Sequence, residues 1–343
     1  MDFSIKTMPN GEKYLDIPEM RTLSDAEMNF KSKGDEDSKN DFLAAFHAFL
    51  DMCIAYCTDV FKDATYENEK LAYDVFIFEA NSENQYKSYL RSTLYIAKLY
   101  AQKWKELINV NNIANCNSLT NSLLADFDWL FTEYENHFKN HDVQPSSWSR
   151  RILCSRDMLW MMGFLTFMEQ WTDMSKISFR DIRPYSIFMV RQCLEISGKS
   201  LIGYYNIEDD NGKVIKSLTQ VPWEYLPIAE KKGYVKLPFA ANCVATLNTW
   251  TNSFVHTSFF YNNFVQYFAA DFMWELFRPR KAGESLTLYN GKPAGYNLAY
   301  GDFRLTKYDE MKADFEQFIK TKTKQQFKIN WLSKDDVEGY ILS

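Results

Sequence analysis

The stretch KNDFLAAFHAFLDMCIAYCTDVFKD, residues 39–63, decides the fold class, because its apolar side chains recur at steps of three to five residues. This spacing places them along one face of an α-helix and leaves the other face polar. The stripe consists of Phe42, Phe46, Phe49, Cys53, Tyr56 and Phe61. It predicts a long amphipathic helix over 39–63.

The same periodicity continues toward the C-terminus and predicts helices over 68–79, 83–107 and 118–138. Residues 39–145 are therefore expected to form an antiparallel helical array with short connections. The preceding residues 1–38 mix Gly, Pro and charged residues. We expect them to be an irregular lead-in with one short strand near 13–17.

A polar segment that contains a proline, residues 140–147, marks the expected domain boundary. Beyond it, residues 146–343 are expected to form a helical bundle with small β-hairpin insertions at two Asn-Gly pairs, 211–212 and 290–291. Residues 219–238, with three prolines, are expected to be a loop, and the last ten residues a capped short helix. Further helices are predicted over 149–172, 184–204, 239–277 and 308–321. The predicted fold is mainly α.

Composition limits the classes of partner. The chain has 343 residues, 17% of them aromatic, so it can bury a sizeable core. Its net charge of −6 argues against a broad nucleic-acid-binding surface, which is usually basic. Short basic runs, such as 278–281 and the lysines between 320 and 328, are interpreted as solvated surface rather than as binding patches.

Membrane insertion and secretion are not expected. The longest apolar run, 158–168, is shorter than the roughly 20 residues that cross a bilayer, and polar residues interrupt the aromatic stretch 254–277. The six cysteines are scattered behind an N-terminus that lacks the pattern of a secretory signal. We therefore expect a cytoplasmic protein with reduced cysteines.

The best candidate for chemistry is the segment 250–256, WTNSFVH, in which an Asn precedes a His by one helical turn. Asn252 and His256 would share one helix face. Histidine can both accept and donate a proton near neutral pH, and the Asn amide can orient it or contact a phosphate oxygen. The alternative is a buried Asn and His that bond to each other or to a facing helix.

Residues 251–256, TNSFVH, resemble the Arg-Asn-x-x-x-His motif of HEPN domains, which are small helical bundles found in RNA-cleaving toxins and phage-defence proteins. The sequence departs from that motif at its first position, where Thr251 replaces the arginine that binds the scissile phosphate. Only Asn252 and His256 carry over. Arginine is hard to replace there, because its planar fork can hold two phosphate oxygens at once.

A second segment, 183–199, is similar to the Arg…Glu…Lys helix that often packs against the motif helix in HEPN bundles. Arg191, Glu195 and Lys199 step by four residues and so share one face. The resemblance implies that Arg191 or Arg183 supplies the missing cation, with Arg183, Lys199 and Glu195 near the substrate. The alternative is a charged ladder on the helix surface.

The resemblance implies a HEPN-like domain within 146–343 that binds RNA or cleaves it without a metal, in a toxin or defence setting. His256 would move protons, Asn252 would position the site, and two protomers would each contribute one motif. The rival interpretation is a non-enzymatic module, with a degenerate HEPN-like domain, that serves dimerisation or docking of a protein partner. A third is a helical scaffold in which His256 is simply buried.

No cofactor or metal is expected. Cys53 and Cys57 lie four residues apart with His47 nearby, but a structural zinc site usually needs four ligands and no fourth is close in sequence. Buried core cysteines are the preferred interpretation. The sequence also lacks a Gly-rich phosphate loop, a Gly-x-Ser-x-Gly elbow and a zincin helix.

Overall fold

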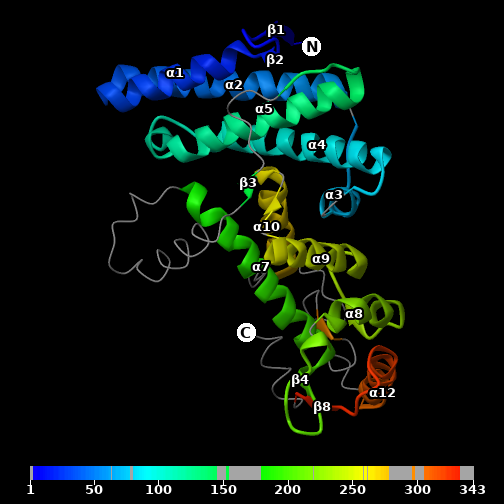
Figure 1. Ribbon diagram of the computed structural model, residues 1–343. Helices are drawn as coiled ribbons and strands as arrows, with labels where there is room; N and C mark the ends of the chain where they lie inside the picture. The colour runs from blue at the N-terminus through cyan, green and yellow to red at the C-terminus, as the bar shows by residue number, and fades with distance from the viewer. Residues whose placement is uncertain are drawn as a thin grey trace. The chain divides into compact units, whose positions relative to one another are not determined.

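The fold is described from a computed structural model of the chain (Figure 1). Within the residues that it describes, the chain is mainly α-helical, as the sequence predicts. Three predicted elements lie outside those residues: the hairpin at 290–291, the helix at the C-terminus and nearly all of the helix over 149–172. The described residues are 3–62, 64–77, 80–144, 152–153, 179–218, 220–257, 259–260, 262–277, 296–297 and 305–332.

The chain forms two compact units. The first contains Met1–Ile187 and Ser253–Phe268, and the second contains Phe188–Asn252 and Ala269–Ser343. The sequence predicts a boundary near residue 145, whereas the chain passes from the first unit to the second inside a helix, between residues 187 and 188.

The first unit is a stack of helices, of which α1 packs on α2, α2 on α4 and α4 on α5 (Figure 1). The helices predicted over 39–63, 68–79, 83–107 and 118–138 are all present, with small shifts at their ends. Side chains cap two of them: Asp35 accepts the backbone N–H of Ser38, and Ser82 accepts that of Gln85. The bounds are α1 Pro18–Lys33, α2 Glu36–Phe61, α3 Asn68–Val75, α4 Glu83–Leu107, the 3-10 turn η1 Ile113–Asn115 and α5 Asn117–Lys139.

Aromatic rings fill the core of this unit. The ring of Phe49 meets that of Phe127 edge-on at 5.6 Å, and the rings of Tyr56 and Phe131 lie 4.6 Å apart. Helix α2 has the length and apolar composition of a membrane span, but its apolar stripe is buried between α1 and α4. Burial of one stripe against neighbouring helices is what the sequence predicts for α2.

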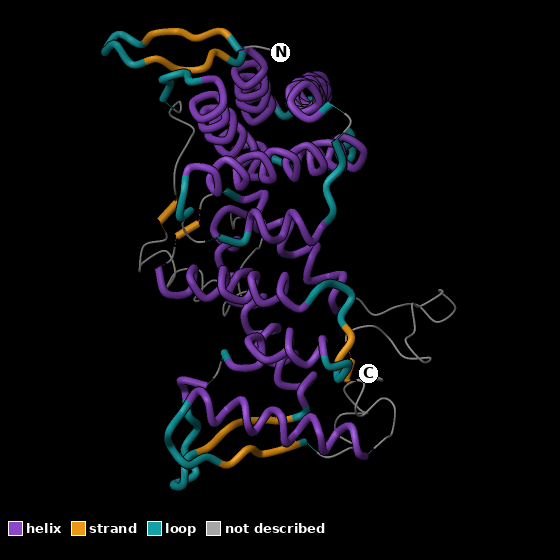
Figure 2. The backbone as a smooth tube through the Cα atoms, turned by 90° about the vertical axis from the view of Figure 1, so that its right-hand side faces the viewer, coloured by secondary structure: helices purple, strands orange, loops and turns teal. Residues whose placement is uncertain are grey.

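The irregular lead-in expected over 1–38 is wrong in part: the short strand predicted near 13–17 is present as β2, but it belongs to a β-hairpin that is followed by α1. Strand β1, Ser4–Thr7, pairs antiparallel with β2, Lys13–Asp16, as Figure 2 shows at the N-terminal end. Gly11 in the connecting turn has φ +89°, which only glycine adopts easily. Helix α1 was missed because few of its residues are apolar; its buried residues are Met20, Leu23 and Glu27.

The single helix expected over 239–277 is also wrong. The chain forms α9, Ala241–Thr257, and α10, Asn263–Phe277, separated by the short strand β6, Phe259–Phe260. Strand β6 pairs with β3, Ile152–Leu153, where the sequence predicts a helix. Asn262 accepts the backbone N–H of Phe264 and so caps the start of α10. Aromatic residues run through both helices and through the segment between them. The hydrophobic pattern of the sequence therefore shows no interruption at the break.

The second unit combines helices with two small antiparallel sheets, β4 with β8 and β5 with β7. The loop expected over 219–238 is wrong in part, because it contains helix α8. Pro222 lies in the first turn of α8, where the missing backbone donor costs nothing. The bounds are α7 Phe179–Ile202, β4 Tyr204–Glu208, the 3-10 turn η3 Lys216–Leu218, α8 Val221–Lys231, β5 Val235–Lys236, β7 Tyr296–Asn297, α12 Leu305–Lys322 and β8 Lys328–Trp331.

The β4–β8 sheet lies against α12 (Figure 2). The ring of Phe315 on α12 lies 5.2 Å from that of Tyr204 and 6.0 Å from that of Trp331. The turn predicted at 211–212 is present, with Gly212 at φ +73° and the Ile215 N–H bonded to the Ile207 carbonyl. The longer ladder of β4, however, is with β8, more than a hundred residues away in sequence.

Helix α7 approaches α8 closely at Gly198. A Cβ atom added there would lie 2.9 Å from Pro222 Cβ and 2.9 Å from the indole Nε1 of Trp223, which donates to the Leu194 carbonyl. Gly198→Ala should therefore lower the free energy of unfolding by about 1–3 kcal/mol, the usual cost of overpacking. Urea denaturation followed by tryptophan fluorescence measures this change.

The matched control is Gln192→Ala, at an exposed position of the same helix. This control should change the free energy of unfolding by less than about 0.5 kcal/mol. Equal stability of Gly198→Ala and the wild type would contradict the close approach of α7 and α8.

Candidate functional site

Of the predicted site residues, Arg191 and Glu195 are in contact, and α7 directs Arg191 onto Asn248 of α9. Only 5% of Arg191 is exposed. Its Nη1 donates to the side-chain Oδ1 of Asn248 on α9 and, at 3.3 Å, to the Asn248 backbone carbonyl. Its Nη2 donates to Oε1 of Glu195, one turn along α7, at 2.8 Å. The guanidinium therefore ties α7 to α9.

Asn248 is the centre of this network, and 4% of it is exposed. Its Oδ1 accepts from Arg191, and its Nδ2 donates to Oε1 of Gln220, at 2.8 Å, just before α8. Its backbone carbonyl also accepts from the Thr251 hydroxyl at 2.8 Å. The amide of Asn248 thus joins three segments, and both ends of the amide are bonded.

The electrostatics of the network follow from burial. Burial lowers the pKa of the Arg191 guanidinium from its usual value, whereas the charge of Glu195 and the hydrogen bond to it act in the opposite direction. A buried guanidinium is tolerated only when its donors are bonded and a counter-charge lies close. Asn248 and Glu195 supply these two conditions.

The structure places the motif residues as follows. Thr251, at the position of the missing arginine, is completely buried, whereas Asn252 is partly exposed. His256 lies one turn further along the backbone of α9, but its side chain is outside the described residues. Of the two described motif positions that the resemblance assigns a role, 251 and 252, only Asn252 therefore has an accessible side chain.

Of the residues predicted near the substrate, the structure describes the side chains of Glu195 and Lys199. Glu195 is partly exposed and paired with Arg191, as expected for an i,i+4 pair. Lys199 is partly exposed, and the side chain of Arg183 lies outside the described residues. The face of α7 that carries Arg191, Glu195 and Lys199 turns from the interior at Arg191 toward solvent at Lys199.

Two network residues, Asn248 and Gln220, were missed in the sequence. Asn248 lies four residues before Asn252 on α9, and this polar spacing in an apolar helix was the available signal. Gln220 had no such signal, because its segment was expected to be a loop.

The cysteines near His47 are buried core residues, which was the preferred interpretation of the sequence. Cys53 and Cys57 are fully buried free thiols, and burial raises the pKa of each well above its usual value. The His47 Nε2 lies 3.0 Å from the Ile108 carbonyl. Within the described part of the chain, no three His, Cys, Asp or Glu side chains are grouped as metal ligands.

Comparison of the chain with protein-family models, with curated proteins and with solved structures found no match.

The network makes Arg191 sensitive to conservative replacement. Arg191→Lys retains the charge but cannot reach Asn248 and Glu195 together, so it should lower the free energy of unfolding by about 1–3 kcal/mol. Thermal and urea denaturation of the purified variant measure this loss.

The control for this variant is Gln192→Lys, which adds a lysine at the neighbouring, exposed position of α7. It should leave the stability within about 0.5 kcal/mol of the wild type. An Arg191→Lys protein as stable as this control would mean that Arg191 is not held by the network.

Proposed function

We propose that this protein is a non-enzymatic interaction protein with a degenerate HEPN-like helix pair, α7 and α9. The observation that carries this proposal is the burial of Arg191, which is one of the two cations, with Arg183, expected to replace the motif arginine. Arg191 is buried and bonded to Asn248 and Glu195. Contact with a scissile phosphate would require Arg191 to leave both partners.

The position of Thr251 supports the same proposal. Its side chain is completely buried, and its hydroxyl donates to the Asn248 carbonyl. A threonine in this setting has neither the charge nor the access to bind a phosphate. Two of the positions from which a phosphate-binding cation was expected, 251 and 191, are therefore occupied by buried side chains that are bonded to Asn248; the side chain of the third, Arg183, lies outside the described residues.

The partner proposed is another protein, with a second copy of this chain as the first candidate. The net charge of −6 disfavours nonspecific attraction to RNA and is compatible with a protein partner. HEPN-like modules, which the motif resembles, act as pairs, so a homodimer is the assembly that this resemblance implies.

Metal-independent RNA cleavage in a toxin or defence setting is the second candidate. It is favoured by the exposure of Asn252, one helical turn before His256 on α9. In that case, His256 would move protons for attack by the RNA 2′-hydroxyl, and the phosphate charge would be met by a group other than Arg191.

Incubation with end-labelled single-stranded RNA in EDTA separates the two candidates. The interaction protein should leave the RNA intact, and its His256→Ala and Asn252→Ala variants should behave in the same way. Sedimentation equilibrium of the same wild-type sample should give the mass of a dimer.

The rejecting result is specific cleavage by the wild type that is lost in both His256→Ala and Asn252→Ala while each variant stays folded. That result would establish the nuclease. Uncleaved RNA together with a monomeric protein at all concentrations tested would reject self-association and leave a different protein as the partner.

A further inference from the structure

One face of α7, in the second unit, is exposed to solvent. The buried side of the helix carries Arg191, which bonds to Asn248 of α9, and Gly198, which approaches α8. Because successive residues turn by about 100° around a helix, Ile196 points away from both of these contacts. Its side chain is 55% exposed. An isoleucine therefore lies at the middle of the solvent-facing side of α7.

The exposed face around Ile196 is uncharged over more than two helical turns. Its described positions are Gln192, Cys193, Ile196 and Ser200, which lie within about 100° of one another around the helix. Charged residues make up 24% of the chain, and the exposed side of a helix normally contains several of them. Depletion of charge around an apolar side chain is typical of the centre of a protein–protein interface.

Two opposite charges, Glu195 and Lys199, border this face on the same side. Glu195 is bonded to Arg191 through Oε1 only, so its Oε2 is left for another donor. Lys199 is partly exposed and, among the described carboxylates, has none as an ion-pair partner. The border of the face thus offers one carboxylate oxygen and one ammonium group to a partner.

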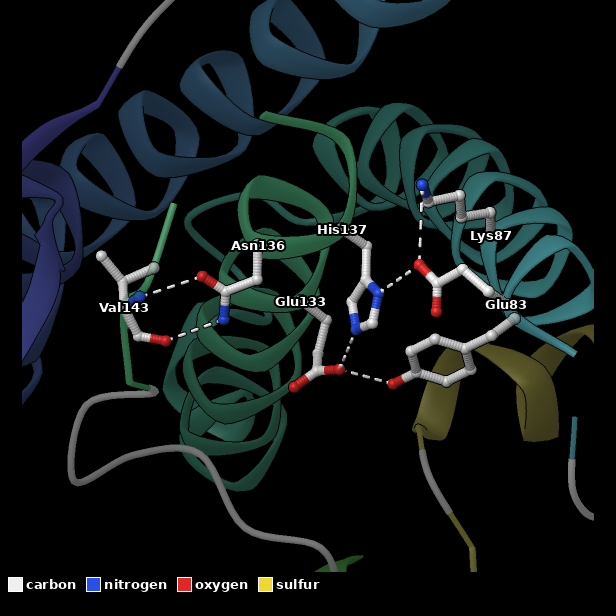
Figure 3. Close-up of polar contacts among 7 residues, drawn as sticks. Glu83, Lys87, Glu133, Asn136, His137 and Val143 are labelled. Atoms are coloured by element: carbon white, nitrogen blue, oxygen red, sulfur yellow. Dashed lines mark hydrogen bonds and ion pairs between the residues drawn. The ribbon is translucent and has the colours of Figure 1, made fainter. Parts of the chain in front are cut away.

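The charges at the ends of α4 and α5 show the contrasting arrangement. There, Oε1 of Glu83 lies 2.9 Å from Nδ1 of His137 and 3.5 Å from the ammonium of Lys87 (Figure 3). These groups are met by neighbours in the same unit. Lys199 differs from Lys87 in this respect, and it lies beside an uncharged face.

The order of Glu195 and Lys199 makes the face complementary to itself. When two copies of a helix pack about a two-fold axis, every contact occurs twice, residue i on j and j on i. In an antiparallel pair with its axis level with position 197, Glu195 of each copy lies opposite Lys199 of the other. The two Ile196 side chains then lie about 3 Å apart along the helix axis. A parallel pair would set each lysine beside its own counterpart.

We propose that a second copy of this chain packs antiparallel on the exposed face of α7, with Ile196 at the centre and two ion pairs between Glu195 and Lys199 at the border. This proposal rests on the proposed function, because it names the surface through which the interaction protein associates with itself. One pair of helix faces is smaller than a standard interface of about 1,200–2,000 Å², so the dimer is expected to be weak.

Disulfide trapping in the full-length protein tests the antiparallel register. Cys193 and position 200 are about 10.5 Å apart along one helix, too far for a disulfide within a chain. In the proposed pair, Cys193 of one copy and position 200 of the other are separated by only about 1.5 Å along the axis. Ser200→Cys should therefore form a disulfide-linked dimer under mild oxidation, with the linked peptides identified by mass spectrometry.

Three proteins serve as controls for the trapping. The wild type should not link through Cys193 alone, because the two thiols lie about 12 Å apart along the axis. The double variant Cys193→Ser/Ser200→Cys should lose the linked dimer. Leu99→Cys, at an exposed position of α4, should form none and so measures random collision.

Sedimentation equilibrium tests the same surface without a cross-link. Ile196→Asp places a charge at the centre of the pair, and Lys199→Glu sets like charges opposite each other, so each should weaken the association at least about tenfold. The matched controls Leu99→Asp and Lys213→Glu make the same changes at exposed positions away from this face. They should leave the association unchanged, and circular dichroism should show the same helix content in all four variants.

The outcomes separate this surface from the proposed function. A dimer that survives both Ile196→Asp and Lys199→Glu would overturn the surface while leaving self-association intact. A linked dimer of Ser200→Cys that persists without Cys193 would also overturn it. A monomeric wild type together with no linked dimer of Ser200→Cys would overturn the surface and the choice of a second copy as partner, whereas the RNA assay alone decides whether the protein is an enzyme.

Discussion

Burial of Arg191 is the constraint on which the candidate site of the second unit depends. A guanidinium removed from water must bond its donors and lie near a counter-charge, and Asn248 and Glu195 meet these needs. Asn248 in turn holds Gln220, just before α8. One charged side chain is therefore bonded, directly or through Asn248, to the three segments that meet here.

This constraint also bears on the choice between the two proposed functions. Arg191, one of the cations expected to meet an RNA phosphate, is bonded between the helices, and the same side chain cannot serve both roles at once. Thr251, at the position that the resemblance assigns to the motif arginine, is buried. The proposed interaction protein and the competing nuclease thus differ in what meets the phosphate charge, while sharing Asn252 and His256 on α9.

The first unit is built on a different balance of forces. Its core is aromatic, with rings of α2 and α5 such as Phe49 and Phe127 in contact, and apolar burial dominates its stability. Polar contacts lie at the helix ends, where Glu83 meets His137 and Tyr86 meets Glu133.

The sequence by itself determined the mainly α fold and the bounds of α2, α4 and α5, because a stripe repeating every three to four residues is a local property. It did not reveal the break between α9 and α10, since aromatic residues continue through it. Nor could it show that Arg191 faces Asn248 or that β4 pairs with β8. Those contacts join residues far apart in the chain, and only tertiary packing decides which face of a helix or edge of a strand is buried.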